Sequence, residues 1–352
     1  MAAKWKTASL AVAIGAAGIA ALGLISGLLY EQTQRAHDRE RYPQVGRSLD
    51  IGGRRLNIDC AGAGQPAVIL ESGANWSLSS AVHDPRTMYA NGGPRPGYSW
   101  VSIQRALASV TTVCWYDRAG SGWSDPGPYP RDSAAQARDL DALLRAARIP
   151  PPYVVVGESS AALDARVFTR LYPSEVAGLV LVNWADPGLF FELRTSSRRA
   201  QRVPQWIYHS QDTMAQLFNW VGLYRLGAVA PAPEPPKGLS AAEWSTIWFL
   251  THSSKAVSAL MQDIASCRLS SAEARAAGSL GSRPLRVLGA GNLDAPPEFF
   301  EAWTKVQNDL ARLSTRGAQT VVNGRASDLL YDAPDAIAEA VRQVLADVRL
   351  PH

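Results

Sequence analysis

Cysteine and histidine are scarce in this chain, which has three copies of the first and five of the second. The cysteines lack the C-x-x-C spacing of a metal or redox site, and their odd number argues against a disulfide framework while leaving one bridge open. Cys60 and Cys114 stand in apolar runs, so we expect them to be small core residues. The chain has no metal-ligand cluster, phosphate-binding loop or dinucleotide-binding fingerprint, and we therefore expect neither a metal nor a cofactor.

Charge of one sign does not accumulate along the chain. The 35 Lys and Arg residues against 31 Asp and Glu give a net charge of +4, and the basic residues form no dense stripe. Such a mildly basic surface argues against nucleic acid as a partner. Apolar residues make up 47% of the 352 residues, which is enough for the core of one large or two ordinary domains.

An uncharged run from Thr7 to Tyr30 dominates the N-terminus. A helix of this length spans a hydrocarbon layer about 30 Å thick, and the run is longer than the apolar part of a secretory signal peptide. We therefore predict a single membrane anchor over residues 1–30, followed by a polar stalk over 31–45. Two lysines precede the run and three arginines follow it, so the positive-inside rule hardly discriminates. Because an N-terminal apolar span usually acts as an export signal, we expect the globular part on the exported side.

Short apolar runs alternate with helical patterns after residue 45, which predicts an α/β protein with a mostly parallel sheet flanked by helices. The later runs are almost continuously apolar, as expected for parallel strands buried on both faces. Helical patterns cover residues 132–149, 162–172 and 333–348. The expected strands are 46–53, 54–60, 67–73, 110–117, 153–159, 177–183, 285–291 and 319–324.

Two segments interrupt this alternation. Residues 187–283 are rich in tryptophan and have helical periods without a strand pattern. We therefore predict a helical lid inserted into an α/β core made of residues 46–186 and 284–352. Residues 74–100 form a second, shorter insertion, and loops of this length in compact domains tend to be functional.

A serine stands between a strand-like run and a helical run, in the sequence Gly157-Glu158-Ser159-Ser160-Ala161. This pattern matches the G-x-S-x-G nucleophile elbow, with alanine in place of the last glycine. A serine hydroxyl attacks only with a base within hydrogen-bond reach and with donors that stabilise the oxyanion. The context predicts that Ser159 is a catalytic nucleophile.

From about Gly46 onwards, the chain resembles the α/β-hydrolase family. The segments that carry the resemblance are VILESG, YDRAGSGWSDPGP, PYVVVGESSAALDAR, YPSEVAGLVLV and YDAPDAIAEAV. The resemblance implies an oxyanion hole made by the backbone N–H groups of Ala74 and Ser160. It also implies a catalytic acid at Asp294, with Asp186 as the alternative.

The resemblance places the family's catalytic histidine shortly before the Asp-x-Pro that starts the last helix. Counting back from Asp332-Ala333-Pro334, this position falls on Ser327, and no histidine occurs between His252 and His352. A second serine hydroxyl is far too weak a base to take the proton of Ser159 near neutral pH.

Other residues near the expected pocket have alternative interpretations. His83 is the alternative base, because its insertion begins at the expected pocket wall. His209 and His252 fall in the predicted lid, and Glu158 is expected to point away from the attack face. We interpret Asp117 and Arg118 as a pair that braces the loop framing the pocket.

Two functions are consistent with these residues. The first is a membrane-anchored serine hydrolase that acts on an ester or similar acyl substrate in an apolar pocket under the lid. The second is a catalytically degenerate hydrolase, a pseudoenzyme that binds an apolar ligand or a protein partner at the membrane.

Overall fold

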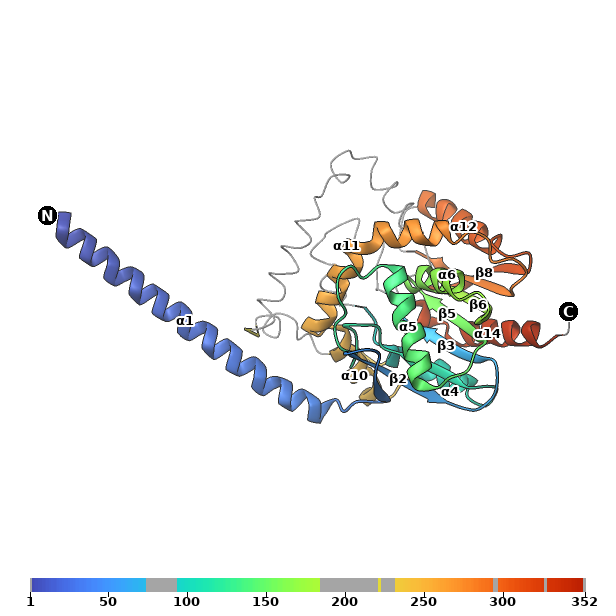
Figure 1. Cartoon of the computed structure of the whole chain (residues 1–352), viewed down its shortest axis with the longest axis horizontal. Coiled ribbons are helices and arrows are strands. Elements are labelled where there is room, and N and C mark those ends of the chain that lie inside the picture. The colour runs from blue at the N-terminus through green and yellow to red at the C-terminus, as the bar shows by residue number, and fades with distance from the viewer. Residues whose placement is uncertain are drawn as a thin grey trace.

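The computed structural model describes residues 2–73, 94–183, 221–222, 232–293, 297–325 and 328–350. Figure 1 shows an α/β body from which one long helix projects. The described residues form an eight-stranded sheet with the order β1-β2-β4-β3-β5-β6-β7-β8. The strands are β1 (Arg47–Asp50), β2 (Arg55–Ala61), β3 (Ala67–Glu71), β4 (Val113–Tyr116), β5 (Tyr153–Glu158), β6 (Val176–Val182), β7 (Leu285–Asn292) and β8 (Gly317–Arg325).

Each of the eight predicted strands is present. The parallel part of the sheet runs from β4 to β8, whereas β2 pairs antiparallel with both β1 and β4. Strands β3, β4 and β5 are buried along their whole length, as their continuous apolar runs predict. Strand β8 differs, because it lies at the edge of the sheet and most of its residues are exposed or half-buried.

Helices cover both faces of the sheet and form two separate apolar cores with it. One face carries α5 (Ser133–Ala147), α6 (Ala161–Leu171) and α11 (Ser254–Ala276), and the other carries α4 (Val101–Leu107) and α14 (Pro334–Arg349). The remaining described helices are η1 (Gly97–Trp100), α10 (Ala241–Thr251), α12 (Pro297–Ala311) and α13 (Leu329–Asp332). The helix α12 has no counterpart among the predicted helical patterns.

Cys60 and Cys114 form the one bridge that the cysteine count left open, and the expectation of a core position is wrong for Cys60. They face each other across the antiparallel pair β2–β4, with Cα atoms 4.1 Å apart. Cys114 is buried, but Cys60 is exposed on the outer side of its strand. The third cysteine, Cys267, is buried in α11.

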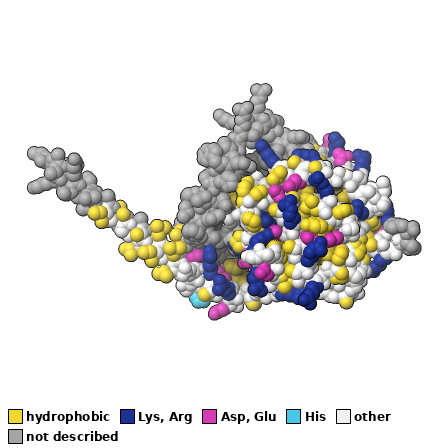
Figure 2. Space-filling view, viewed as in Figure 1, with side chains coloured by type: hydrophobic (Ala, Val, Ile, Leu, Met, Phe, Trp, Pro, Cys, Tyr) yellow, Lys and Arg dark blue, Asp and Glu magenta, His cyan; other side chains and the backbone are white. Residues whose placement is uncertain are grey.

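The N-terminal helix α1 (Ala2–Arg41) has 40 residues. Within its part from Ile14 to Arg41, an 18-residue window has a mean hydropathy of 1.6 and only 6% of that window is buried, so the helix is long and apolar enough to cross a membrane. Hydrophobic side chains lie along this projecting helix in Figure 2. The helix continues without a break to Arg41, so most of the predicted stalk is helical and extends the anchor.

Candidate active site

Ser159 lies in the turn between β5, which ends at Glu158, and α6, which begins at Ala161. Its backbone is left-handed, with a φ of +54°, a conformation that costs a non-glycine residue about 1–3 kcal/mol. Its N–H donates to the carbonyl oxygen of Val182 at the end of β6, at 2.9 Å. This strand, sharp turn and helix are the arrangement in which the elbow motif exposes a nucleophile.

Two glycines allow the chain to pack tightly around this turn. A Cβ on Gly157 would lie 2.5 Å from the carbonyl oxygen of Ala161, and a Cβ on Gly73 would lie 2.5 Å from the backbone nitrogen of Ser160. The segment that follows β3 therefore lies directly beside a predicted oxyanion donor. Ala161 is fully buried, so the alanine that replaces the last glycine of the motif fits the turn.

A buried ion pair joins the elbow to its surroundings. The Glu158 and Arg95 side chains are 4% and 3% exposed, and Oε1 lies 3.1 Å from Nη1. The other carboxylate oxygen accepts from the N–H of Gly73 at 3.4 Å, and a second guanidinium nitrogen lies 3.4 Å from Asp328. The guanidinium also lies over the ring of Tyr331, 5.0 Å from its centre. Burial raises the pKa of Glu158, while Arg95 opposes this shift.

The described residues include part of the predicted site. Ser159 and Ser160 are described, and Arg95 reaches Asp328, the residue directly after the predicted base position. The second oxyanion donor, both alternative acids, the alternative base and the residue at the usual histidine position stay predictions. These five, Ala74, His83, Asp186, Asp294 and Ser327, lie outside the described residues.

Asp117 braces the loop after β4, in agreement with the interpretation from sequence. Its carboxylate accepts hydrogen bonds from the N–H groups of Gly97 (2.6 Å) and Trp123 (2.9 Å) and from the side chain of Asn57 (3.0 Å). The side chain is fully buried, and burial raises its pKa while these three donors lower it. A carboxylate held by three donors serves the loop rather than an incoming substrate.

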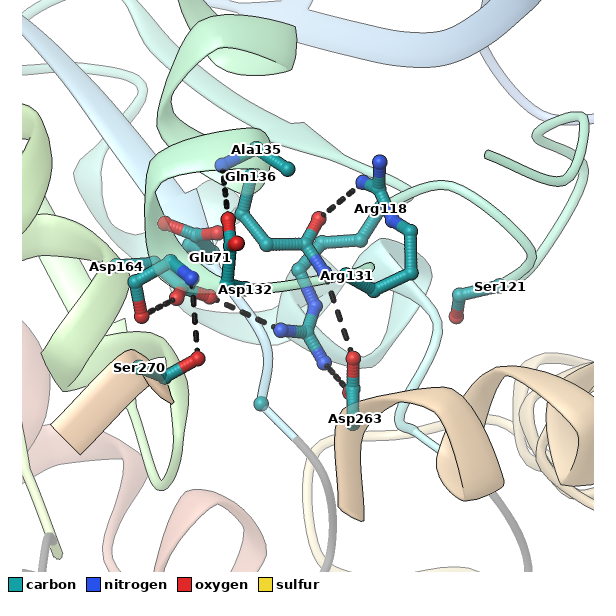
Figure 3. Close-up of polar contacts among 12 residues, drawn as sticks. Glu71, Arg118, Ser121, Arg131, Asp132, Ala135, Gln136, Asp164, Asp263 and Ser270 are labelled. Atoms are coloured by element: carbon teal, nitrogen blue, oxygen red, sulfur yellow. Dashed lines mark hydrogen bonds and ion pairs between the residues drawn. The ribbon is translucent and has the colours of Figure 1, made fainter. Parts of the chain in front are cut away.

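Arg118 has a larger role than the bracing of its own loop, because it holds two buried carboxylates (Figure 3). Its guanidinium lies 3.0 Å from Asp164, in the first turn of α6, and 2.6 Å from Asp263 on α11. The hydroxyl of Ser133 donates to Asp164, and Gln136 donates to Asp263. This cluster, here the Arg118 cluster, connects the helix that follows Ser159 to the segment between β6 and β7.

The sequence did not single out Arg95, Asp164 or Asp263, because their partners are far away in the chain. Arg95 and Glu158 are 63 residues apart, and Arg118 and Asp263 are 145 apart. The long 74–100 insertion contains two arginines, Arg86 and Arg95, and nothing in the sequence distinguishes the one that pairs with Glu158.

A family model described as alpha/beta hydrolase fold matches residues 88–281. The chain belongs to the α/β-hydrolase family. This confirms the predicted family and the predicted fold of a mostly parallel sheet flanked by helices.

Individual relatives cover the α/β-hydrolase chain to different extents. Over 137 residues, it is 32% identical to an uncharacterized vacuolar membrane protein of Saccharomyces cerevisiae, covering 38% of this chain and 20% of that protein. The chain thus spans about a fifth of the length of this relative. A solved thermophilic esterase from Thermogutta terrifontis has a TM-score of 0.52 and 18% identity, over 87% of this chain and 100% of that chain. A hydrolase from Pseudomonas aeruginosa PA01 has a TM-score of 0.56 and 17% identity, over 86% and 99%; at such identities the likeness shows the fold alone.

Glu71, the last residue of β3, is a buried acid beside the Arg118 cluster of this α/β-hydrolase. It is 1% exposed, and its Oε1 accepts a hydrogen bond of 2.6 Å from the hydroxyl of Tyr116. Its Oε2 has no hydrogen-bond partner among the described residues. Burial, together with the nearby Asp164, raises the pKa of Glu71 to about 8, against the opposing influence of Arg118. The folded protein therefore holds this carboxyl protonated at neutral pH.

We expect Glu71→Gln to stabilise the protein at alkaline pH. Between its ordinary pKa of 4.5 and about 8, Glu71 carries a proton in the folded state only, so the free energy of unfolding falls as pH rises through this range. Glutamine removes this dependence and should raise the free energy of unfolding at pH 8 by at least about 1.4 kcal/mol, the equivalent of one pKa unit. Denaturant titrations of the full chain in detergent micelles at pH 5 and pH 8 measure the effect. The exposed Glu339→Gln is the control, and an unchanged pH dependence in Glu71→Gln would contradict the prediction.

The helix α11 is fixed to the core by side chains spaced three or four residues apart along one face. These α11 side chains accept hydrogen bonds from backbone N–H groups at and just before the start of α5. The first N–H groups of a helix have no partner within the helix, so α11 supplies one. Asp132 caps the next N–H of the same helix end. The pairs are Arg131 N with Ser266 Oγ, Ser133 N with Ser270 Oγ and Ala134 N with Glu273 Oε2, at 3.0 Å each.

Aromatic side chains on α10 contact Tyr331, the ring that lies under the buried Arg95 guanidinium. Trp244 lies 5.2 Å from Tyr331, ring centre to ring centre, and 5.9 Å from Trp248. The ring of His252 lies 4.0 Å from that of Trp248, and its Nδ1 lies 2.8 Å from the Trp248 carbonyl oxygen. These half-buried rings give the segment between β6 and β7 an aromatic stripe that contacts the short helix α13 after β8. Within the described ranges, no three His, Cys, Asp or Glu side chains are grouped so that they could hold a metal ion.

Proposed function

We propose that this α/β-hydrolase is a membrane-associated serine hydrolase that acts on an ester or similar acyl substrate. The observation that carries the proposal is the left-handed backbone of Ser159 at the β5–α6 turn, with Gly73 packed against Ser160. Local strain of this kind persists where the surrounding structure imposes it, and it is concentrated at functional sites. The Trp244 and Trp248 rings support an apolar acyl group as the part of the substrate that is recognised.

In the proposed reaction, Ser159 Oγ forms a bond to the carbonyl carbon while its proton passes to a base. The N–H groups of Ser160 and Ala74 stabilise the oxyanion, the alcohol leaves with a proton, and water then releases the acid. Asp294, or Asp186 in its place, is the proposed acid. With Ser327 at the usual imidazole position, the proton passes to water or to His83, and wild-type turnover is slow.

We also propose that the anchor α1 holds the hydrolase at a membrane, with the body on the exported side and residues 187–283 serving as a lid. The apolar length of α1 supports the anchor, and one curated relative is named a vacuolar membrane protein. The Cys60–Cys114 disulfide supports the exported side, because such bonds persist in oxidising compartments.

A ligand-binding pseudoenzyme is the second candidate function. It is favoured by the absence of histidine after His252 until the last residue of the chain. In that case the pocket holds an apolar ligand or a protein partner without acyl transfer.

An activated fluorophosphonate should label Ser159. Because this reagent is a strong electrophile, its reaction depends more on the position of the serine hydroxyl and on the oxyanion donors than on a general base. Mass spectrometry of the labelled full chain in detergent micelles should find the adduct on Ser159. Ser159→Ala should remove the label, whereas the adjacent Ser160→Ala should keep it, since its backbone N–H remains. An adduct on another serine, or no adduct, would contradict the proposed placement of the nucleophile.

A further inference from the structure

The anchor helix α1 touches the segment between β6 and β7 at a glycine. A Cβ on Gly27 would lie 2.6 Å from the carbonyl oxygen of Val221 and 3.0 Å from its Cβ. One turn further along α1, a Cβ on Gly222 would lie 3.0 Å from the ring of Tyr30 and 3.5 Å from the carboxylate of Glu31. Backbone approaches backbone here because Gly27 has no side chain.

The residue directly after α1 contacts this segment a second time. The ring of Tyr42 stacks on Phe249 of α10, with ring centres 4.2 Å apart and an angle of 10° between the planes. Between the two contacts, Glu31 is only 4% exposed although it lies on the projecting helix. Contacts around Gly27 and at Tyr42 therefore join this part of the chain to the segment between β6 and β7 at two points, while most side chains between them are exposed.

The first contact falls at the end of the membrane-crossing part of α1. Gly27 and Tyr30 are the last residues of the uncharged run, and the basic residues Arg35, Arg39 and Arg41 follow. The side chains of Ile19, Leu22, Ile25 and Leu29 are 53–75% exposed, so this part of α1 offers an uncovered apolar surface, visible in Figure 2. A bilayer that covers this surface has its interface at the level of Val221.

We propose that Val221 and Gly222 lie in the interface of a phospholipid bilayer against α1, and that the Ser159 site takes an amphiphilic acyl lipid from that bilayer. The second half of this proposal rests on the proposed function. The segment that carries the aromatic stripe of α10 is then held at the membrane surface by two contacts with the anchor.

The placement of Val221 can be tested without any enzymatic activity. Val221→Cys can be labelled selectively with an environment-sensitive fluorophore, because Cys60 and Cys114 are bonded and Cys267 is buried. In the full chain in phosphatidylcholine vesicles, we expect strong quenching by a doxyl group placed near the lipid headgroup and weak quenching by aqueous iodide. The exposed Ser282→Cys on the body is the control and should show the opposite pattern. Iodide quenching at Val221 equal to that at Ser282 would overturn the placement.

The contact itself is tested by a matched pair of substitutions in one helix. Gly27→Leu inserts a side chain where Val221 lies, whereas Gly23→Leu adds the same side chain where nothing lies within 4 Å. Both variants should float with vesicles, but Gly27→Leu alone should lose most of the doxyl quenching at Val221→Cys. Equal quenching in the two variants would overturn the contact.

The substrate class is tested with the same pair in the Ser327→His background. Gly27→Leu should lower hydrolysis of a long-chain ester carried in phosphatidylcholine vesicles by about tenfold, as expected when a positioning contact is displaced. It should leave hydrolysis of a soluble acetate ester unchanged, and Gly23→Leu should change neither. An equal effect of Gly27→Leu on both esters would overturn the lipid substrate. If neither ester is hydrolysed in any background, the proposed function fails, whereas the quenching result still decides the membrane placement.

Discussion

Replacing Ser327 by histidine is expected to raise the rate of ester hydrolysis by about 10²-fold or more, which is the usual contribution of a general base. The substitution supplies an imidazole with a pKa near 6.5 at the position where the family carries its base. Wild-type hydrolysis of a short acyl ester should be slow, and Ser159→Ala should change the wild-type rate little. Steady-state rates of the full chain in detergent micelles measure the gain.

The double variant Ser159→Ala/Ser327→His shows whether the gain passes through the elbow, because it should return the rate to the wild-type level. Removal of Asp294 or Asp186 in the Ser327→His background should identify the acid that orients the new imidazole. Fast wild-type turnover that Ser159→Ala abolishes would contradict the expected weak activity. If His83→Ala also abolished that turnover, His83 would be the base.

Arg118→Met is expected to lower the free energy of unfolding by about 3–5 kcal/mol, the usual cost of removing one partner from a buried ion pair. The guanidinium is 5% exposed and is the shared partner of Asp164 and Asp263, which are 6% and 8% exposed. Methionine fills much of the same volume but leaves both carboxylates buried without their cation. Denaturant titration of the full chain in detergent micelles measures the loss.

Two further variants separate the loss of charge pairing from the loss of packing. Adding Asp164→Asn and Asp263→Asn to Arg118→Met should recover part of the loss, because uncharged amides cost less to bury. Arg312→Met is the matched control, since its ion pair with Asp309 lies on the surface and should be worth no more than about 1 kcal/mol. A loss in Arg118→Met no larger than in Arg312→Met would show that the Arg118 cluster does not stabilise the fold.

The sheet and the elbow could be predicted from sequence because local patterns specify them. The eight strands are short apolar runs, and Ser159 stands where a strand meets a helix within a fixed five-residue motif. The exposure of strand β8 could not be predicted from its own residues, because its position at the edge depends on the order of all strands in the sheet. The sequence patterns do not predict helix α12, although its Trp303 and Leu310 side chains are buried.

The contacts that fix the site could not be predicted, because they join residues far apart in the chain. The Cys60–Cys114 disulfide requires β2 to pair with β4 rather than with β3, and this depends on topology. The ion pair of Arg95 with Glu158 likewise depends on how the insertion after β3 returns to the elbow. The roles of Ser327, His83 and the two alternative acids stay predictions, and the variants described above test them.

The fixed position of α11 limits which parts of this α/β-hydrolase can move. A slide of α11 by one turn, about 5.4 Å, would withdraw Ser266, Ser270 and Glu273 from the backbone donors at the start of α5 all at once. Breaking several buried hydrogen bonds together is far more costly than breaking them one at a time at a frayed end. Under the proposed function, any movement that admits a substrate is therefore expected before Asp263, in α10 and the first turns of α11, while the rest of α11 stays fixed to the start of α5.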